Sequence, residues 1–155
     1  LINKFLDMQT KIILNNSGTI DKYMGDCIMS FWNAPLDCEN HADLAVKSAL
    51  EVLDATKELN EELKPLNLPP INVGIGISSG ECIVGNMGSE LRFDYSVIGD
   101  AVNLGARLEG QTRNYDGVDL LLSERTYQLC PDRAFTRVDR IKVKGKSEQV
   151  TIYTI

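Results

Sequence analysis

The sequence predicts a mixed α/β fold in which helices cover a sheet. Three observations support this prediction: a long segment with apolar residues at helical spacing, short apolar runs bounded by Gly or Pro, and alternation of the two patterns along the chain. The chain has 155 residues, of which 43% are hydrophobic and 25% charged, so we expect one domain spanning 1–155. It begins at Leu1 rather than Met, and we expect it to be a fragment whose sensor or membrane segments lie upstream.

A helix and a hairpin are predicted first. Residues 1–15 carry apolar side chains at helical spacing, and Gly18 is expected to be the left-handed residue that ends the helix. Two apolar arms in 19–32 flank the dipeptide Gly25-Asp26. This pattern predicts a β-hairpin with the carboxylate of Asp26 at its tip. For Asp26 alone, an ordinary turn aspartate would be the simpler interpretation.

A second helix and two strands are predicted next. The helix spans about 39–63, and Pro65 ends it. Strands are expected over about 71–78 and 81–86. Glycine is unfavourable inside a strand, so Gly74 and Gly76 indicate a bulge or the close approach of another part of the protein.

The remaining elements alternate between strand and helix. A strand over about 93–98 precedes a helix over about 100–112. After a turn, a short buried strand is followed by a helix capped by Ser123. The last expected strands are 135–144 and 149–155.

Composition excludes several classes of function. The net charge of −6 argues against nucleic-acid binding, which requires a basic face. No apolar run approaches the roughly 18 residues of a membrane span, and no signal peptide is visible. The four cysteines have no zinc-type spacing, which favours reduced thiols. We therefore expect a cytoplasmic domain without membrane contact.

Asn103 and Arg107 form the most informative pair of side chains. They follow an apolar run that ends at Gly99, and their spacing of four residues places them on one face of the predicted helix. An amide beside a permanent cation suits a ligand that carries both a hydroxyl oxygen and a phosphate. For the pair alone, a solvated helix face would be the more common interpretation.

Five segments in order resemble the catalytic domain of the class III nucleotidyl cyclases, the adenylyl and guanylyl cyclases. They are 19–32, 73–81, 84–89, 96–109 and 143–146. The resemblance implies a ferredoxin-like palm sandwich with a mostly antiparallel sheet, whose first strand lies upstream of Leu1. It also implies that ATP is converted to 3′,5′-cyclic AMP and pyrophosphate with two divalent metal ions, Mg²⁺ or Mn²⁺.

The resemblance assigns a role to each candidate residue. Asp26 matches the second of two metal-binding aspartates, and the first belongs to the missing strand. Lys22 and Ser96 match positions that read the base. At the position of Lys22, lysine is typical of adenylyl members, whereas guanylyl members usually have glutamate. At the position of Ser96, serine or threonine is typical of one subgroup of adenylyl members. Asn103 and Arg107 match the pair that orients the ribose and stabilises charge at the α-phosphate.

The resemblance has three further consequences. Lys144 matches a phosphate-binding lysine, whereas Gly74 stands where several relatives have a phosphate-binding arginine, a role that Arg92 is a candidate to take over. The family forms dimers in which the metal aspartates and the other site residues come from different subunits. Two alternatives stay open: a non-catalytic module that binds nucleotide or only dimerises, and a guanylyl cyclase, which Lys22 and Ser96 disfavour.

Overall fold

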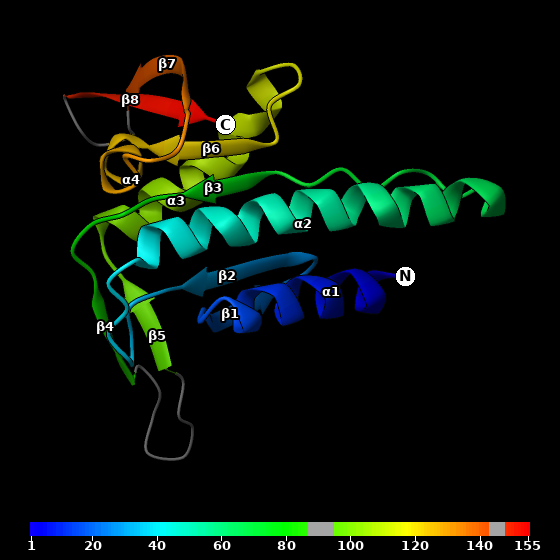
Figure 1. Cartoon of the computed structure of the whole chain (residues 1–155), viewed down its shortest axis with the longest axis horizontal. Coiled ribbons are helices and arrows are strands. Elements are labelled where there is room, and N and C mark those ends of the chain that lie inside the picture. The colour runs from blue at the N-terminus through cyan, green and yellow to red at the C-terminus, as the bar shows by residue number, and fades with distance from the viewer. Residues whose placement is uncertain (87–94, 143–147) are drawn as a thin grey trace. The chain divides into compact units, whose positions relative to one another are not determined.

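The computed structural model describes residues 1–86, 95–142 and 148–155, and it divides into two compact units, Leu1–Val73 and Gly74–Ile155 (Figure 1). Lys144 and Arg92 lie outside the described residues. No helix within the described ranges is long and apolar enough to span a membrane.

The first unit has the predicted order of helix, hairpin and helix. Its elements are α1 (Ile2–Asn15), β1 (Thr19–Met24), β2 (Cys27–Phe31), α2 (His41–Leu63) and the 3-10 helix η1 (Lys64–Leu66). In α2, small and aliphatic residues repeat at helical spacing on the buried side, and the helix gives way to η1 where Pro65 follows. The predicted elements of this unit are therefore confirmed.

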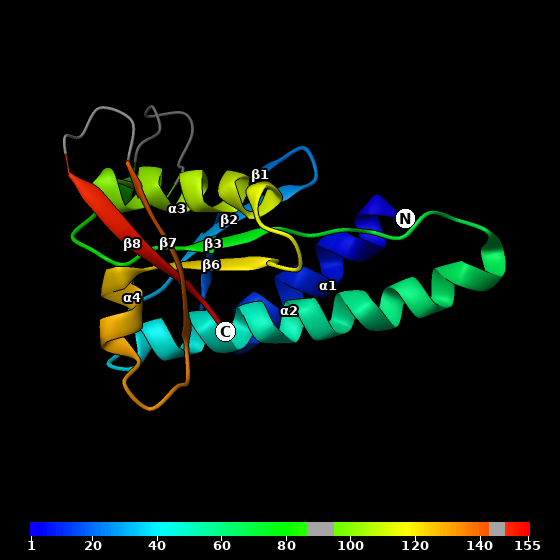
Figure 2. The same cartoon turned by 90° about the horizontal axis from the view of Figure 1, so that it is seen from above.

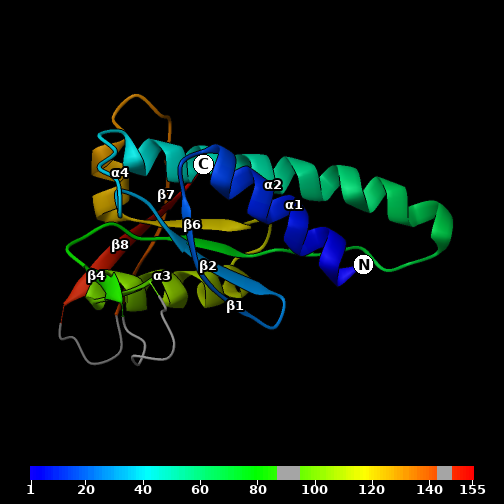
Figure 3. The same cartoon turned by 90° about the horizontal axis from the view of Figure 1, so that it is seen from below.

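A hydrophobic cluster joins the two helices of this unit. Phe5 of α1 packs with Leu59 and Leu63 of α2, and all three are buried. Figure 3 shows α1 running beside α2. The ion pair between Lys4 and Glu62, at 2.9 Å, lies at the same end but is exposed, so it contributes little next to the apolar cluster.

The residue that ends α1 differs from the prediction. Ser17, with φ of 68°, adopts the left-handed conformation, while the amide of Gly18 donates to the carbonyl of Ile13 at 2.9 Å. Gly18 is required for a different reason, because a Cβ there would lie 2.6 Å from Ile13 Cγ2 and 2.8 Å from the Trp32 ring. The prediction that Gly18 is the left-handed residue was therefore wrong.

The described residues of the second unit form a four-stranded sheet and a two-stranded one. The elements are β3 (Ile75–Ile77), β4 (Ile83–Asn86), β5 (Tyr95–Ile98), α3 (Asp100–Gln111), η2 (Thr112–Asn114), β6 (Leu120–Ser123), α4 (Glu124–Leu129), β7 (Thr136–Lys142) and β8 (Gln149–Thr154). The larger sheet has the order β3-β6-β8-β7, and β4 pairs with β5. Pairing is parallel only between β3 and β6 among the described strands, so the predicted α/β fold with a mostly antiparallel sheet is confirmed.

Helix α3 covers one face of the larger sheet (Figure 2). Leu108 of α3, Leu121 of β6 and Ile152 of β8 form its core and are fully buried. Ser123 caps α4 as predicted, since its hydroxyl accepts a hydrogen bond from the amide of Thr126. The core therefore fixes α3 by one face and leaves its other face to solvent.

Candidate functional site

The β1–β2 hairpin carries Lys22 and Asp26. Its strands are joined by a two-residue turn, Gly25-Asp26, and the positive φ of Gly25, 63°, suits the first central position of a type II′ turn. Lys22 and Asp26 are both exposed. Neither side chain has a hydrogen bond or ion pair with another residue in the described part of the chain. The ammonium group and the carboxylate are therefore available to an external ligand.

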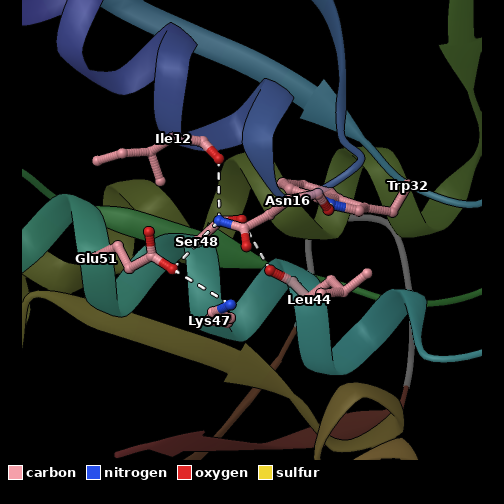
Figure 4. A network of polar contacts seen from close by, with 7 residues as sticks. All are labelled: Ile12, Asn16, Trp32, Leu44, Lys47, Ser48 and Glu51. Carbon is pink, nitrogen blue, oxygen red and sulfur yellow. Dashed lines mark hydrogen bonds and ion pairs between the residues drawn. The ribbon is translucent and has the colours of Figure 1, made fainter.

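A polar network holds the base of this hairpin (Figure 4). Trp32, next to the end of β2, donates from Nε1 to the carbonyl of Asn16 at 2.9 Å. The Asn16 side chain, which is buried, donates to the carbonyl of Ile12 at 3.0 Å and to Glu51 at 3.4 Å. Because this network includes both helices, it fixes the base of the hairpin while the tip stays exposed.

Gly99 determines where α3 begins. Its φ of 153° and ψ of 170° belong to a region that is essentially limited to glycine. Its carbonyl accepts hydrogen bonds from the amides of Val102 and Asn103, at 3.1 and 3.2 Å. The conformation therefore requires glycine, and a Cβ at Gly99 would also lie a tight 3.2 Å from the carbonyl oxygen of Glu81.

The prediction that Asn103 and Arg107 lie one turn apart on a helix is confirmed, because α3 contains both residues. Both are exposed, whereas Leu108 is fully buried and Leu104 packs against the core. Neither side chain has a hydrogen bond or ion pair with any described residue. Farther along, Arg113 of η2 pairs instead with Glu109 of α3. Asn103 and Arg107 therefore present an amide and a guanidinium group to which no described residue bonds.

Ser96 is placed differently from these exposed residues. It lies in β5 and is buried, with 8% of its surface exposed. It pairs with Gly85 of β4, where an added Cβ would meet nothing within 4 Å. No described side chain fills the position of Gly85 beside Ser96 across the ladder.

Sequence reasoning missed an open hollow next to the start of α3. It measures about 530 Å³ and is lined by Glu81, Cys82, Ile83, Ile98 and Gly99. Ile83 and Ile98 pair directly across the ladder and are 66% and 51% exposed. Partial desolvation raises the pKa of the Cys82 thiol, although the residue is exposed, so a smaller fraction of it is thiolate at neutral pH. The strand pattern of 81–86 alone does not show that these isoleucines face outward.

A metal ion would need ligands beyond those described here. No group of three or more His, Cys, Asp or Glu side chains in the described ranges is arranged to hold one. Asp26 supplies an exposed carboxylate with no partner among the described residues, and carboxylate oxygen is the donor that Mg²⁺ and Mn²⁺ prefer. The chemistry of Asp26 fits a hard divalent ion, as one ligand of an incomplete set.

The predicted residues fall in both units. Lys22 and Asp26 belong to Leu1–Val73, and Ser96, Asn103 and Arg107 belong to Gly74–Ile155. Within the second unit, α3 brings Asn103 and Arg107 together, and Ser96 precedes α3 on β5.

Sequence comparisons place this chain among nucleotide cyclases. The family model of the adenylate and guanylate cyclase catalytic domain matches residues 1–155. An adenylate cyclase of Anabaena cylindrica is 38% identical over 159 residues, which cover 99% of this chain and 31% of that protein. Adenylate cyclase 1 of Rhizobium meliloti is 31% identical over 156 residues, covering 100% of this chain and 23% of the relative. The chain therefore spans less than a third of these relatives.

Solved structures agree with this grouping. The adenylyl cyclase CyaB from P. aeruginosa matches with a TM-score of 0.87 and 34% identity, over 98% of this chain and 78% of that one. The guanylyl cyclase Cya2 matches nearly as well, with a TM-score of 0.85 and 34% identity, over 98% of this chain and 76% of the Cya2 chain. This chain belongs to the adenylate and guanylate cyclase catalytic domain family.

Proposed function

We propose that this chain is the catalytic domain of an adenylate cyclase, which converts ATP to 3′,5′-cyclic AMP and pyrophosphate. The observation that carries the proposal is the Asn103–Arg107 pair, two exposed polar side chains one helical turn apart with no partner among the described residues. The membership of the chain in the cyclase family and its named adenylate cyclase relatives support the reaction type.

In the proposed reaction, the ribose 3′-oxygen attacks the α-phosphorus of the same nucleotide. The bond to the bridging oxygen breaks, pyrophosphate leaves, and the 3′-hydroxyl proton passes to solvent. Arg107 would donate to the α-phosphate oxygens as their charge develops, and Asn103 would hold the ribose so that the attacking oxygen stays in line. A divalent metal ion at Asp26 would supply charge neutralisation and a lower pKa of the 3′-hydroxyl.

Lys22 carries the proposed preference for adenine. Its ammonium group only donates hydrogen bonds, so it suits the unprotonated N1 of adenine and opposes the N1–H of guanine. The Ser96 hydroxyl accepts as well as donates, and it discriminates less between the two bases. The similarity of the chain to the guanylyl cyclase Cya2 makes guanylate cyclase activity the alternative to test.

We further propose that two copies of the chain form the active sites. Asp26 would come from one copy, and Lys22, Ser96, Asn103, Arg107 and Lys144 from the other. Two equivalent sites then form across a two-fold axis. In this arrangement Lys22 and Asp26 serve different sites, although they are neighbours on one hairpin.

The experiment measures cyclic AMP and cyclic GMP made from ATP or GTP with Mn²⁺. It uses a protein that also contains the strand expected upstream of Leu1. Cyclic AMP in large excess would support the proposal, and similar amounts of both products would contradict the role of Lys22. A folded dimer without product would favour the non-catalytic alternative. Mixing Asp26→Ala and Arg107→Ala chains should restore part of the activity, because one site of the mixed dimer keeps every group.

A further inference from the structure

Small residues alternate along β3 and its extensions. Gly74, Gly76, Ser78 and Gly80 are two residues apart, so within the strand they point to the same face of the sheet. All four lie beside α3. A Cβ at Gly80 would be 2.9 Å from the Cβ of Ala101, and one at Gly76 would collide with the α3 backbone.

The facing stripe of α3 has the matching spacing. Ala101, Gly105 and Glu109 are four residues apart, and Thr112 follows directly after the helix. A Cβ at Gly76 would overlap the Gly105 carbonyl oxygen and the Glu109 amide nitrogen, and one at Gly74 would overlap Thr112 Oγ1. Four helical residues rise about 6 Å and two strand residues about 6.6 Å, so the two stripes stay in step.

We call this contact the glycine seam: Gly74, Gly76, Ser78 and Gly80 against Ala101, Gly105, Glu109 and Thr112. It explains why glycine, which is unfavourable in a strand, occurs here: at Gly76 the strand backbone meets the helix backbone directly, and at Gly74 it meets the Thr112 side chain. The separation between β3 and α3 is therefore set by the absence of side chains.

The seam lies opposite the proposed catalytic pair. Gly105 is two residues from Asn103 and two from Arg107, and each step of two residues turns the helix by about 200°. Both functional side chains therefore leave α3 on the side away from the seam, which agrees with their exposure. Any shift of α3 away from β3 moves both side chains outward by the same distance.

We infer that the glycine seam positions Asn103 and Arg107 for cyclisation, with Gly76 as its central positioning residue. This inference rests on the proposed function. A displacement of about 1 Å at reacting groups can cost on the order of 10²-fold in rate. The backbone atoms of α3 that a Cβ at Gly76 would meet cannot rotate away, so the helix itself must move.

The first test is Gly76→Ala, compared with Gly110→Ala. Gly110 also lies in the α3 region, but a Cβ there has Arg113 Nη1 at 3.8 Å as its nearest contact. We expect Gly76→Ala to lower kcat about 10- to 100-fold and Gly110→Ala to leave kcat within about twofold, since it only removes a helix glycine. Equal kcat for the two variants would overturn the inference.

A second pair of variants distinguishes displacement of α3 from misfolding of the protein. The clash at Gly74 is with a side-chain atom, Thr112 Oγ1. Gly74→Ala should therefore lower kcat, and adding Thr112→Ala should restore most of it by removing the obstructing hydroxyl. Additive losses in the double variant would contradict the seam.

Mixed dimers distinguish positioning from general damage. A Gly76→Ala chain should regain activity when mixed with Asp26→Ala, because one site then has an intact Asp26 and an undisturbed Arg107. Mixed with Arg107→Ala it should regain nothing beyond its own reduced activity, since each site of that dimer has either a missing or a displaced Arg107. If both mixtures regain the same activity while the wild type is active, the inference is overturned and the proposed function stands. If the wild type itself is inactive, both are overturned.

Discussion

The two regions that carry the proposed site residues are held in different ways. The β1–β2 hairpin is fixed at its base by side-chain hydrogen bonds around Asn16 and Trp32, and its tip with Asp26 is exposed. Helix α3 is fixed on its inner face by the buried Leu108 and by the close contacts of the glycine seam, which at Gly76 join the two backbones. The base of the hairpin therefore depends on polar side chains, which substitutions can remove one at a time. The close approach of α3 to β3 depends on the absence of side chains, so a substitution that adds one disturbs it.

This difference predicts opposite responses to mutation. Removing side chains should weaken the hairpin and leave the seam intact, and adding a methyl group should disturb the seam. The residues that act in both regions, such as Asp26 and Arg107, have no partner among the described residues, so their removal should alter activity without altering stability.

The largest expected effect is that of Arg107→Ala. Loss of one transition-state donor lowers kcat by about 10²- to 10³-fold. The melting temperature should not fall, because the guanidinium group contacts no described side chain through a hydrogen bond or ion pair. Arg113→Ala is the control, since its ion pair with Glu109, at 3.4 Å, is exposed and contributes little. A drop in melting temperature with Arg107→Ala would show that this residue supports the fold.

Next in size is Asn16→Ala at the base of the hairpin. The Asn16 amide is buried and donates to Ile12 and Glu51, so its loss leaves a buried carbonyl without its side-chain donor. We expect a loss of about 1–3 kcal/mol in the free energy of unfolding, measured by urea denaturation. Asn15→Ala, next to it but exposed, should change stability by less than about 0.5 kcal/mol. Equal effects would mean that the network does not hold the hairpin.

Tyr115→Phe should have a smaller, pH-dependent effect. The Tyr115 hydroxyl donates to Asp139 at 2.6 Å. Burial, and then this bond, raise the pKa of Tyr115 to about 12, while the bond from Tyr115, and then the Arg140 amide, lower the pKa of Asp139. The contribution of Tyr115 is complete below its unfolded pKa of about 10 and disappears as the pH rises toward 12; that of Asp139 is complete above about 3.9 and disappears at lower pH.

The difference in melting temperature between wild type and Tyr115→Phe should therefore be constant between about pH 5 and 9 and shrink outside that window. Tyr127→Phe is the control, because its ring stacks on Tyr153 at 4.0 Å but its hydroxyl has no hydrogen bond to a described residue. As the pH falls below about 5, its difference from wild type should stay constant, because only the Tyr115–Asp139 bond is lost there. A constant difference for Tyr115→Phe would show that the bond does not perturb either group.

Local patterns predicted the elements better than they predicted the contacts between them. The apolar periodicity of 39–63 and the Gly25-Asp26 turn signal are local properties, and α2 and the hairpin were found where expected. The pairing of β3 with β6 joins two short strands far apart in the chain, so tertiary packing decides it. The same holds for Gly76, whose glycine signalled a close approach without showing that α3 is what approaches.

The candidate site follows the same division. Helical spacing was sufficient to place Asn103 and Arg107 together, because both lie within one element. No local pattern showed that Ile83 and Ile98 would be exposed opposite one another, since this depends on the register between two strands. The left-handed residue at the end of α1 was also missed: Ser17 has the positive φ, and Gly18 is needed for its close contacts with Ile13 and with Trp32 of a later segment.

The smallest expected effect concerns two adjacent serines. Ser78 Oγ is buried in the glycine seam and has no hydrogen-bond partner among the described residues, whereas Ser79 Oγ lies 2.7 Å from Thr126 Oγ1. Ser78→Ala removes a polar group that is buried without compensation, so stability should stay the same or rise by up to about 1 kcal/mol. Ser79→Ala removes a satisfied bond and should lower stability by about 1 kcal/mol.

The midpoint of urea denaturation, compared at constant m-value, should stay the same or rise for Ser78→Ala and fall for Ser79→Ala. Both substitutions remove one hydroxyl at neighbouring positions. They therefore compare directly a contact that depends on a side-chain hydrogen bond with one that does not. If Ser78→Ala proves as destabilising as Ser79→Ala, the Ser78 hydroxyl must bond to α3 in solution. The seam would then depend on a side chain, as the base of the hairpin does, and not only on the absence of side chains.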